Sequence, residues 1–225
     1  MCFSATASFS ASVVIGLVGI VTIRSCKKKE ELFLGAVPFL FALQQVSEGF
    51  VWLSIRNSDF RTFQHLFSLC FLFFAWVVWP ILIPLAFYKL EPDKTRKLWC
   101  KRLIYVGIAS GLYAIFNMIT KYPVPDIATF HIIYKVQKSF HHDFFFIPHQ
   151  TAYILATVLP MFLSSLKGVK ILAITNFIAL LLCFIFFQYA LPSTWCFFAA
   201  FLSGIIYRII NHPHNRISLL SESGS

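Results

Sequence analysis

The second apolar segment of the chain, residues 32–54, carries the side chains best suited to chemistry. Glu48 is an acid within a stretch long enough to cross a bilayer as a helix. An ionisable group at membrane depth costs about 2.5–3.5 kcal/mol on insertion scales, so it usually has a partner or a function. Gln44 and Gln45 precede Glu48 by one helical turn, and Trp52 follows it by one turn. We therefore expect these four side chains to share one side of a helix and to form part of a site.

Imidazole groups elsewhere in the chain predict a divalent-metal site around this acid. Imidazole nitrogens together with a carboxylate suit zinc above all, which takes three or four protein ligands. The expected metal ligands are His65, His149, His142, His141 and Glu48. Glu48 is alternatively the general base for a metal-bound water. No H-x-x-x-H or H-E-x-x-H motif is present, so the ligands must come from separate helices.

Further polar and aromatic side chains are expected to hydrogen-bond these ligands or to contact a bound molecule. They belong to the predicted helices that end or begin on the same side of the membrane as Glu48. The residues are Gln44, Gln45, Tyr153, Gln150, Trp52 and Asn117.

The N-terminus offers a separate reactive group. If the initiator Met is removed, Cys2 carries a free α-amine and a thiol. This pair can chelate a metal, or the thiol can act as a nucleophile with the amine as its base. Cys2 is therefore a candidate catalytic residue beside Glu48, and an incidental second residue is the alternative.

The composition predicts an all-α, polytopic integral membrane protein that positions these groups. The chain is 58% hydrophobic and only 12% charged, with 27 Phe in 225 residues. Apolar runs of about 18 residues or more recur, which is typical of membrane helices and excludes a barrel. The formal net charge of +10 does not indicate nucleic-acid binding, because the basic residues lie in short loops between apolar runs.

Seven transmembrane helices are expected in a single membrane domain, residues 1–210, followed by a flexible cytoplasmic tail, residues 211–225. The expected spans are residues 8–23, 32–54, 62–87, 103–120, 145–166, 171–189 and 194–210. Residues 89–102 are expected to form a charged loop, and residues 121–144 to include an interfacial helix. The first span follows no basic region and no small-residue cleavage site follows it, so we expect a retained signal-anchor.

The Lys and Arg residues predict the orientation. With seven spans, 14 of the 19 Lys and Arg residues lie on one side of the membrane and 5 on the other. The positive-inside rule then places the N-terminus outside and the C-terminus in the cytoplasm. Glu48 lies in the outer half of its helix, so the site is expected to face the exterior, which is the periplasm for a bacterial inner membrane.

Two motifs resemble a known family. The N-terminal sequence MCFSATASFSAS and the helix sequence QQVSEGFVW, residues 44–52, resemble uncharacterised bacterial multi-pass membrane proteins that begin MCFSA and carry a QQ-x-x-EG-x-x-W helix. The resemblance emphasises Cys2, Gln44, Gln45, Glu48 and Trp52, and implies no substrate.

The seven-helix architecture is also similar to the intramembrane hydrolases that include alkaline ceramidases and adiponectin receptors. Those hydrolases use three His, a Ser and an Asp around zinc, but the similarity implies only a fold class for this chain. This chain lacks the paired His of their last helix, because His212 and His214 lie at the wrong end.

These observations favour a membrane-embedded, metal-dependent enzyme, with zinc as the expected cofactor. Its polar, outward-facing site would hydrolyse an ester or amide bond of a lipid or another amphiphile. The alternatives are a receptor or sensor for a small ligand or metal ion, and a transporter for a small solute or ion. The expected partners are the lipid bilayer and a lipid or small-molecule ligand, without nucleic acid; the oligomeric state stays open.

Overall fold

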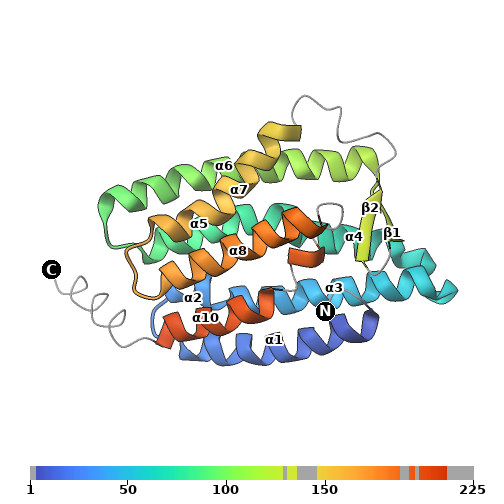
Figure 1. Cartoon of the computed structure of the whole chain (residues 1–225), viewed down its shortest axis with the longest axis horizontal. Coiled ribbons are helices and arrows are strands. Elements are labelled where there is room, and N and C mark those ends of the chain that lie inside the picture. The colour runs from blue at the N-terminus through green and yellow to red at the C-terminus, as the bar shows by residue number, and fades with distance from the viewer. Residues whose placement is uncertain (1–3, 129–130, 136–145, 188–192, 196–197, 212–225) are drawn as a thin grey trace.

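The computed structural model describes residues 4–128, 131–135, 146–187, 193–195 and 198–211. Most of these residues are helical, and the long helices lie roughly parallel in an elongated bundle (Figure 1). Each of the seven segments predicted to span a membrane contains a helix, which confirms the all-α prediction.

The elements follow one another with short connections. In chain order they are α1 (Ala5–Ser25), α2 (Glu31–Gly35), α3 (Val37–Arg56), the 3-10 helix η1 (Ser58–Phe63), α4 (Gln64–Phe73), the π-helical turn η2 (Phe74–Val78), α5 (Trp79–Leu90), α6 (Lys94–Lys121), β1 (Val124–Ala128), β2 (His131–Lys135), α7 (Phe146–Leu163), α8 (Val169–Phe187) and α10 (Ala199–Asn211).

Five helical stretches are long and apolar enough to cross a membrane. They are Ala5–Ser25, Glu31–Arg56, Ser58–Leu90, Lys94–Lys121 and Val169–Phe186. The helix α10 is apolar but has only 13 residues. These findings are consistent with an integral membrane protein with five candidate spans among the described residues.

One predicted helix boundary and one predicted type of secondary structure were wrong. The fourth helix begins at Lys94 instead of residue 103, because Asp93 caps its first turn by accepting a hydrogen bond from the Arg96 amide at 2.8 Å. The described part of the segment expected to include an interfacial helix, residues 124–128 and 131–135, is instead an antiparallel β-hairpin, and residues 136–144 lie outside the described residues. Pro123 and Pro125 lack the amide hydrogens that a helix needs, whereas the β-branched residues nearby favour strands.

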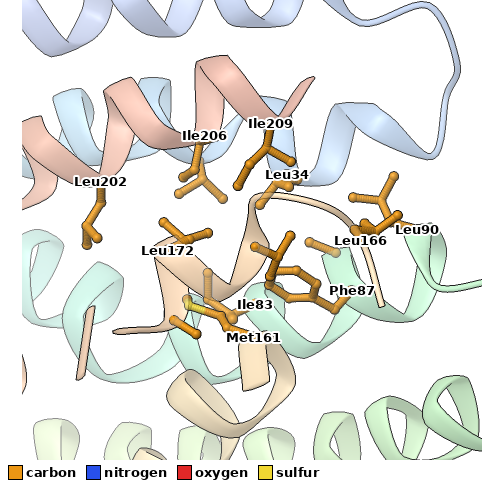
Figure 2. Packing of buried hydrophobic residues seen from close by; sticks show 14 of the residues in the cluster. Leu34, Ile83, Phe87, Leu90, Met161, Leu166, Leu172, Leu202, Ile206 and Ile209 are labelled. Atoms are coloured by element: carbon orange, nitrogen blue, oxygen red, sulfur yellow. The ribbon is translucent and has the colours of Figure 1, made fainter. Parts of the chain in front are cut away.

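The two ends of the bundle differ in what they carry. The β-hairpin lies at one end, beside α4 and the end of α3; we call this the hairpin end (Figure 1). The turns at residues 26–30, 91–93 and 164–168 lie at the opposite end, which we call the basic end because most Lys and Arg residues flank it. A large apolar core joins α2, α5, α7, α8 and α10 near the basic end (Figure 2).

Small residues bring neighbouring helices into close contact. A Cβ atom added to Gly107 of α6 would lie 1.8 Å from the Pro80 carbonyl oxygen of α5. A Cβ atom at Gly19 of α1 would lie 2.6 Å from the Phe39 backbone nitrogen of α3. Such approaches are typical of helix pairs in membranes, where small residues let backbones meet. The Gly19–Phe39 contact holds α3 against α1 and therefore positions the polar side chains of α3.

Candidate functional site

The polar face of α3 points into the bundle. Gln44, Gln45 and Glu48 are each 0% exposed, and so is Trp52 one turn further on. The helix α3 packs along α1 and also contacts α4 and α10, so protein surrounds this face. The spacing predicted from the sequence therefore does place the acid and both amides inside the protein, where the dielectric is low. We call Gln45, Glu48 and Ser193 the polar cluster.

Glu48 meets a hydroxyl that the sequence did not single out. Ser193 donates a hydrogen bond from its Oγ to Oε1 of Glu48, and Ser193 is itself 0% exposed. The two residues are 145 positions apart in the chain. A hydrogen bond from a hydroxyl to a carboxylate is charge-assisted and among the stronger hydrogen bonds in proteins. It places a base directly on an alcohol oxygen.

Neighbouring helices hold the Ser193 segment in place. Trp195, two residues after Ser193, donates a hydrogen bond from Nε1 to Oδ1 of Asn176 in α8 at 3.2 Å. The Trp195 ring also packs edge-on against the Tyr153 ring of α7, with the ring centres 6.1 Å apart. Because α7 and α8 both contact Trp195, the Ser193 hydroxyl is held against α3.

Tyr153 is anchored by a defect in the helix that contains η2. The Trp79 amide donates to the Phe74 carbonyl, five residues earlier, instead of to the Ala75 carbonyl, four residues earlier. In a π-helix the next donor to the Ala75 carbonyl would be residue 80, but Pro80 has no amide hydrogen. The Tyr153 hydroxyl donates to the Ala75 carbonyl oxygen instead, at 2.6 Å. Tyr153 therefore supports the backbone and orients Trp195.

The two amides of α3 have different surroundings. The Gln44 Oε1 atom accepts a hydrogen bond from Trp79 Nε1 at 2.8 Å, which ties α3 to α5. The side-chain oxygen and nitrogen of Gln45 are buried and have no hydrogen-bond partner in the described protein. The same is true of the Trp52 indole nitrogen. A buried polar group without a partner costs about 1–3 kcal/mol, so Gln45 and Trp52 are candidates for contact with a bound molecule.

His65 and His149 contact residues outside the polar cluster. His65 is exposed, and its ring lies 5.5 Å from the Tyr122 ring at the hairpin end. His149 Nδ1 lies 3.2 Å from Ser110 Oγ of α6, and its ring packs 4.7 Å from Tyr113. Within the described ranges, no three His, Cys, Asp or Glu side chains gather closely enough to hold a metal ion. Those residues alone therefore do not fit the expected zinc centre.

The remaining predicted site residues are dispersed or lie outside the described residues. Asn117 is buried but donates to the Tyr113 carbonyl of its own helix at 2.7 Å, and Gln150 is exposed. Cys2, His141 and His142 lie outside the described residues.

Two other acids of the described ranges are buried, both at the basic end. Glu91 accepts hydrogen bonds from the Ser165 amide at 2.9 Å and the Ser165 hydroxyl at 2.5 Å. Glu31 accepts from the Lys27 amide at 2.7 Å. Burial, with a smaller contribution from the nearby Glu31, raises the pKa of the Cys26 thiol to about 11. Glu31 and Glu91 thus stabilise backbone turns by accepting hydrogen bonds from the amides of Lys27 and Ser165.

Ser193 is the residue that sequence reasoning missed. It lies in the sequence LPSTW, where a hydroxyl residue follows a proline at the start of an apolar run, a pattern typical of a helix cap. Because a helix cap accounts for Ser193, the sequence gives no reason to expect that it also contacts an acid. The only available signal was the predicted depth of the segment, since the neighbouring Thr194 was expected at the same membrane level as Glu48.

The fold and the polar cluster together define an all-α bundle with five candidate membrane spans among its described residues and a buried acid–hydroxyl pair. The chain belongs to DUF6629, a family of unknown function, which matches residues 1–218. This membership agrees with the uncharacterised family expected from the sequence. Neither a curated protein nor a solved structure matched the chain.

Proposed function

We propose that this protein is a membrane-embedded hydrolase that cleaves an ester or amide bond of an amphiphile at the polar cluster. The observation that carries the proposal is the hydrogen bond from the Ser193 hydroxyl to the buried Glu48 carboxylate. A base bonded to an alcohol is the arrangement that activates a serine nucleophile.

The proposed reaction uses only side chains of the chain and water. Glu48 takes the proton from Ser193 Oγ as that oxygen bonds to the substrate carbonyl carbon. The carbonyl oxygen becomes an oxyanion, and Glu48 then protonates the leaving alcohol or amine as its bond to carbon breaks. Water next attacks the acyl-serine with Glu48 as base, which releases the acid and restores Ser193.

Gln45 is suited to stabilise the oxyanion. It lies one helical turn before Glu48, and its buried amide nitrogen has no hydrogen-bond partner in the described protein. A donor held in a water-poor site is worth more to a developing negative charge than a donor in water. The apolar bundle around the cluster favours a substrate with an acyl chain, and because Ser193 and Glu48 are fully buried, substrate binding requires local opening.

The test is turnover by the purified protein in lipid nanodiscs. Fluorogenic esters with short, medium and long acyl chains, and a matching amide, serve as probes. We expect Ser193→Ala and Glu48→Gln each to lower hydrolysis by about 100-fold or more. Ser203→Ala is the matched control, because Ser203 is a buried serine that bonds only to the Ala199 carbonyl of its own helix. Equal rates in all four proteins would rule the proposal out.

A ligand receptor is the second candidate. The unpartnered amide of Gln45 and the unpartnered indole nitrogen of Trp52 support binding without requiring a reaction. Native mass spectrometry of protein extracted from its own membrane would then detect a retained small molecule that Gln45→Leu loses, with no turnover of any ester probe.

Metal dependence stays a prediction of the sequence. Three of its expected groups, Cys2, His141 and His142, lie outside the described residues. Elemental analysis of the wild-type protein and His149→Ala tests it: the serine mechanism predicts hydrolysis that survives chelators, whereas a zinc mechanism predicts stoichiometric zinc and loss of activity on chelation.

A further inference from the structure

The first turns of α6 form a basic, amphipathic surface at the basic end of the bundle. Lys94, Lys97 and Lys101 follow one another at spacings of three and four residues, so they share one side of the helix. Arg102 follows Trp99 by three residues, and its guanidinium carbon lies 4.7 Å from the centre of the Trp99 ring. The helix thus combines positive charges with an aromatic side chain on its outer surface.

Apolar side chains on this surface are exposed beside the charges. Leu98 is 49% exposed and Trp99 is 47% exposed, whereas Cys100 and Leu103 of the same helix are buried. Exposed Leu and Trp between Lys and Arg residues are typical of a helix segment at a membrane interface. Trp is enriched at that depth because its ring is apolar and its N–H is polar.

The nearby acids are directed to the backbone instead of to these cations. Asp93 accepts from the Arg96 amide, and Glu91 accepts from Ser165. The Nζ atom of Lys97 lies 5.5 Å from the Tyr88 ring, and Arg102 lies over Trp99, so both cations rest on aromatic faces. Aromatic faces orient a cation without neutralising it. The positive charge of this surface is therefore available to an anion.

We propose that this surface, formed by Lys94, Leu98, Lys101 and Arg102 with the Trp99 ring beneath Arg102, binds the head group of an anionic phospholipid. The phosphodiester and any further negative group would meet Lys94, Lys101 and Arg102, while Leu98 and the Trp99 ring contact the upper part of the acyl chains. Basic clusters next to a membrane helix attract anionic lipids, and an Arg that lies on an aromatic ring is held in place for such contact. This inference is independent of the proposed hydrolase.

The test is native mass spectrometry of the full-length protein from nanodiscs that hold equal amounts of phosphatidylglycerol and phosphatidylcholine. We expect the wild type to retain phosphatidylglycerol preferentially. The triple variant Lys94→Gln, Lys101→Gln, Arg102→Gln should lower this preference by about tenfold or more, since each basic residue near an anionic lipid contributes appreciably. Circular dichroism and thermal unfolding establish that the variant remains folded.

A same-end control separates a specific site from general charge attraction. The triple variant Arg24→Gln, Lys29→Gln, Lys170→Gln removes three exposed charges from the same end but leaves α6 intact. Retained preference in this control, and its loss in the α6 variant, supports the site. Equal loss in both variants, unchanged preference in the α6 variant, or full displacement of the lipid by inorganic phosphate overturns it. Trp99→Phe should preserve lipid retention better than Trp99→Ala.

Discussion

Three carboxylates are buried among the described residues, and they lie in different surroundings. At the basic end, Glu31 accepts a hydrogen bond from the Lys27 amide, and Glu91 accepts from both the amide and the hydroxyl of Ser165, so both close turns between helices. In the interior, Glu48 of α3 accepts from the side-chain hydroxyl of Ser193, beside the amide of Gln45. A serine hydroxyl bonds to both Glu48 and Glu91, so neither burial nor a serine donor alone marks a functional acid. Glu48 differs because Gln45, one helical turn away, keeps a buried amide without a hydrogen-bond partner in the described protein.

The largest expected contrast is in activity. Glu48→Gln keeps the size of the side chain but removes the base, so hydrolysis should fall by about 100-fold or more. Glu91→Gln should leave hydrolysis within about twofold, because Glu91 is at the basic end and bonds to Ser165. Rates measured side by side in nanodiscs check this. A comparable loss in Glu91→Gln would mean that the two acids do not differ in function.

The largest expected effect on the free energy of unfolding comes from the close contact between α5 and α6. Gly107→Ala places a Cβ atom 1.8 Å from the Pro80 carbonyl oxygen, and a backbone atom cannot move aside easily. We expect a loss of about 3 kcal/mol in the free energy of unfolding, the upper range for overpacking. Gly204→Ala is the control, because its Cβ would meet no atom within 4 Å. Unfolding in mixed micelles measures both variants, and equal stability would contradict the observed α5–α6 contact.

The stability effects of the two kinds of acid should also differ. Glu91→Gln loses charge-assisted hydrogen bonds to Ser165, so we expect it to destabilise the fold by about 2 kcal/mol. Glu48→Gln should change stability less, by about 1 kcal/mol, because it weakens the one hydrogen bond from Ser193, whereas Glu91→Gln weakens two from Ser165. Thermal unfolding of both variants measures the difference. The reverse order would indicate that Glu48 is mainly structural.

The smallest expected effect is on thiol reactivity at the basic end. The pKa of Cys26 is raised from 9.0 to about 11, so its reactive thiolate is scarce at pH 9 and increases as the pH rises toward 11. In a variant whose only cysteine is Cys26, alkylation at pH 9 should be far slower in the folded protein than after denaturation. Glu31→Gln should speed the folded reaction slightly, because Glu31 is the smaller cause of the shift.

The sequence predicted the helices well because membrane spans depend on long apolar runs, and such runs are local. It also predicted that Gln44, Gln45 and Glu48 share a buried face, because helical spacing alone decides this. The hairpin over residues 124–128 and 131–135 was missed because the pattern of its short strands is much weaker than that of the long apolar helices.

The partner of Glu48 could not be predicted from the sequence. Ser193 is 145 positions from Glu48, and their contact depends on Trp195, Asn176 and Tyr153 holding one short segment in place. Tyr153 in turn bonds to a carbonyl that is free only because Pro80 follows a π-helical turn. No local pattern encodes such a chain of contacts, so the sequence pointed to His149 instead.

The most direct test of the account is covalent labelling with an alkyl fluorophosphonate, which reacts with activated serine hydroxyls. We predict one adduct on the intact protein, located at Ser193 by peptide mapping, absent in Ser193→Ala and unchanged in Ser203→Ala. In Glu48→Gln the same adduct should form about 100-fold more slowly, because the hydroxyl has lost its base. An adduct at Ser193 that forms equally fast without the Glu48 carboxylate, or no adduct in a protein that still hydrolyses esters, would contradict the central claim.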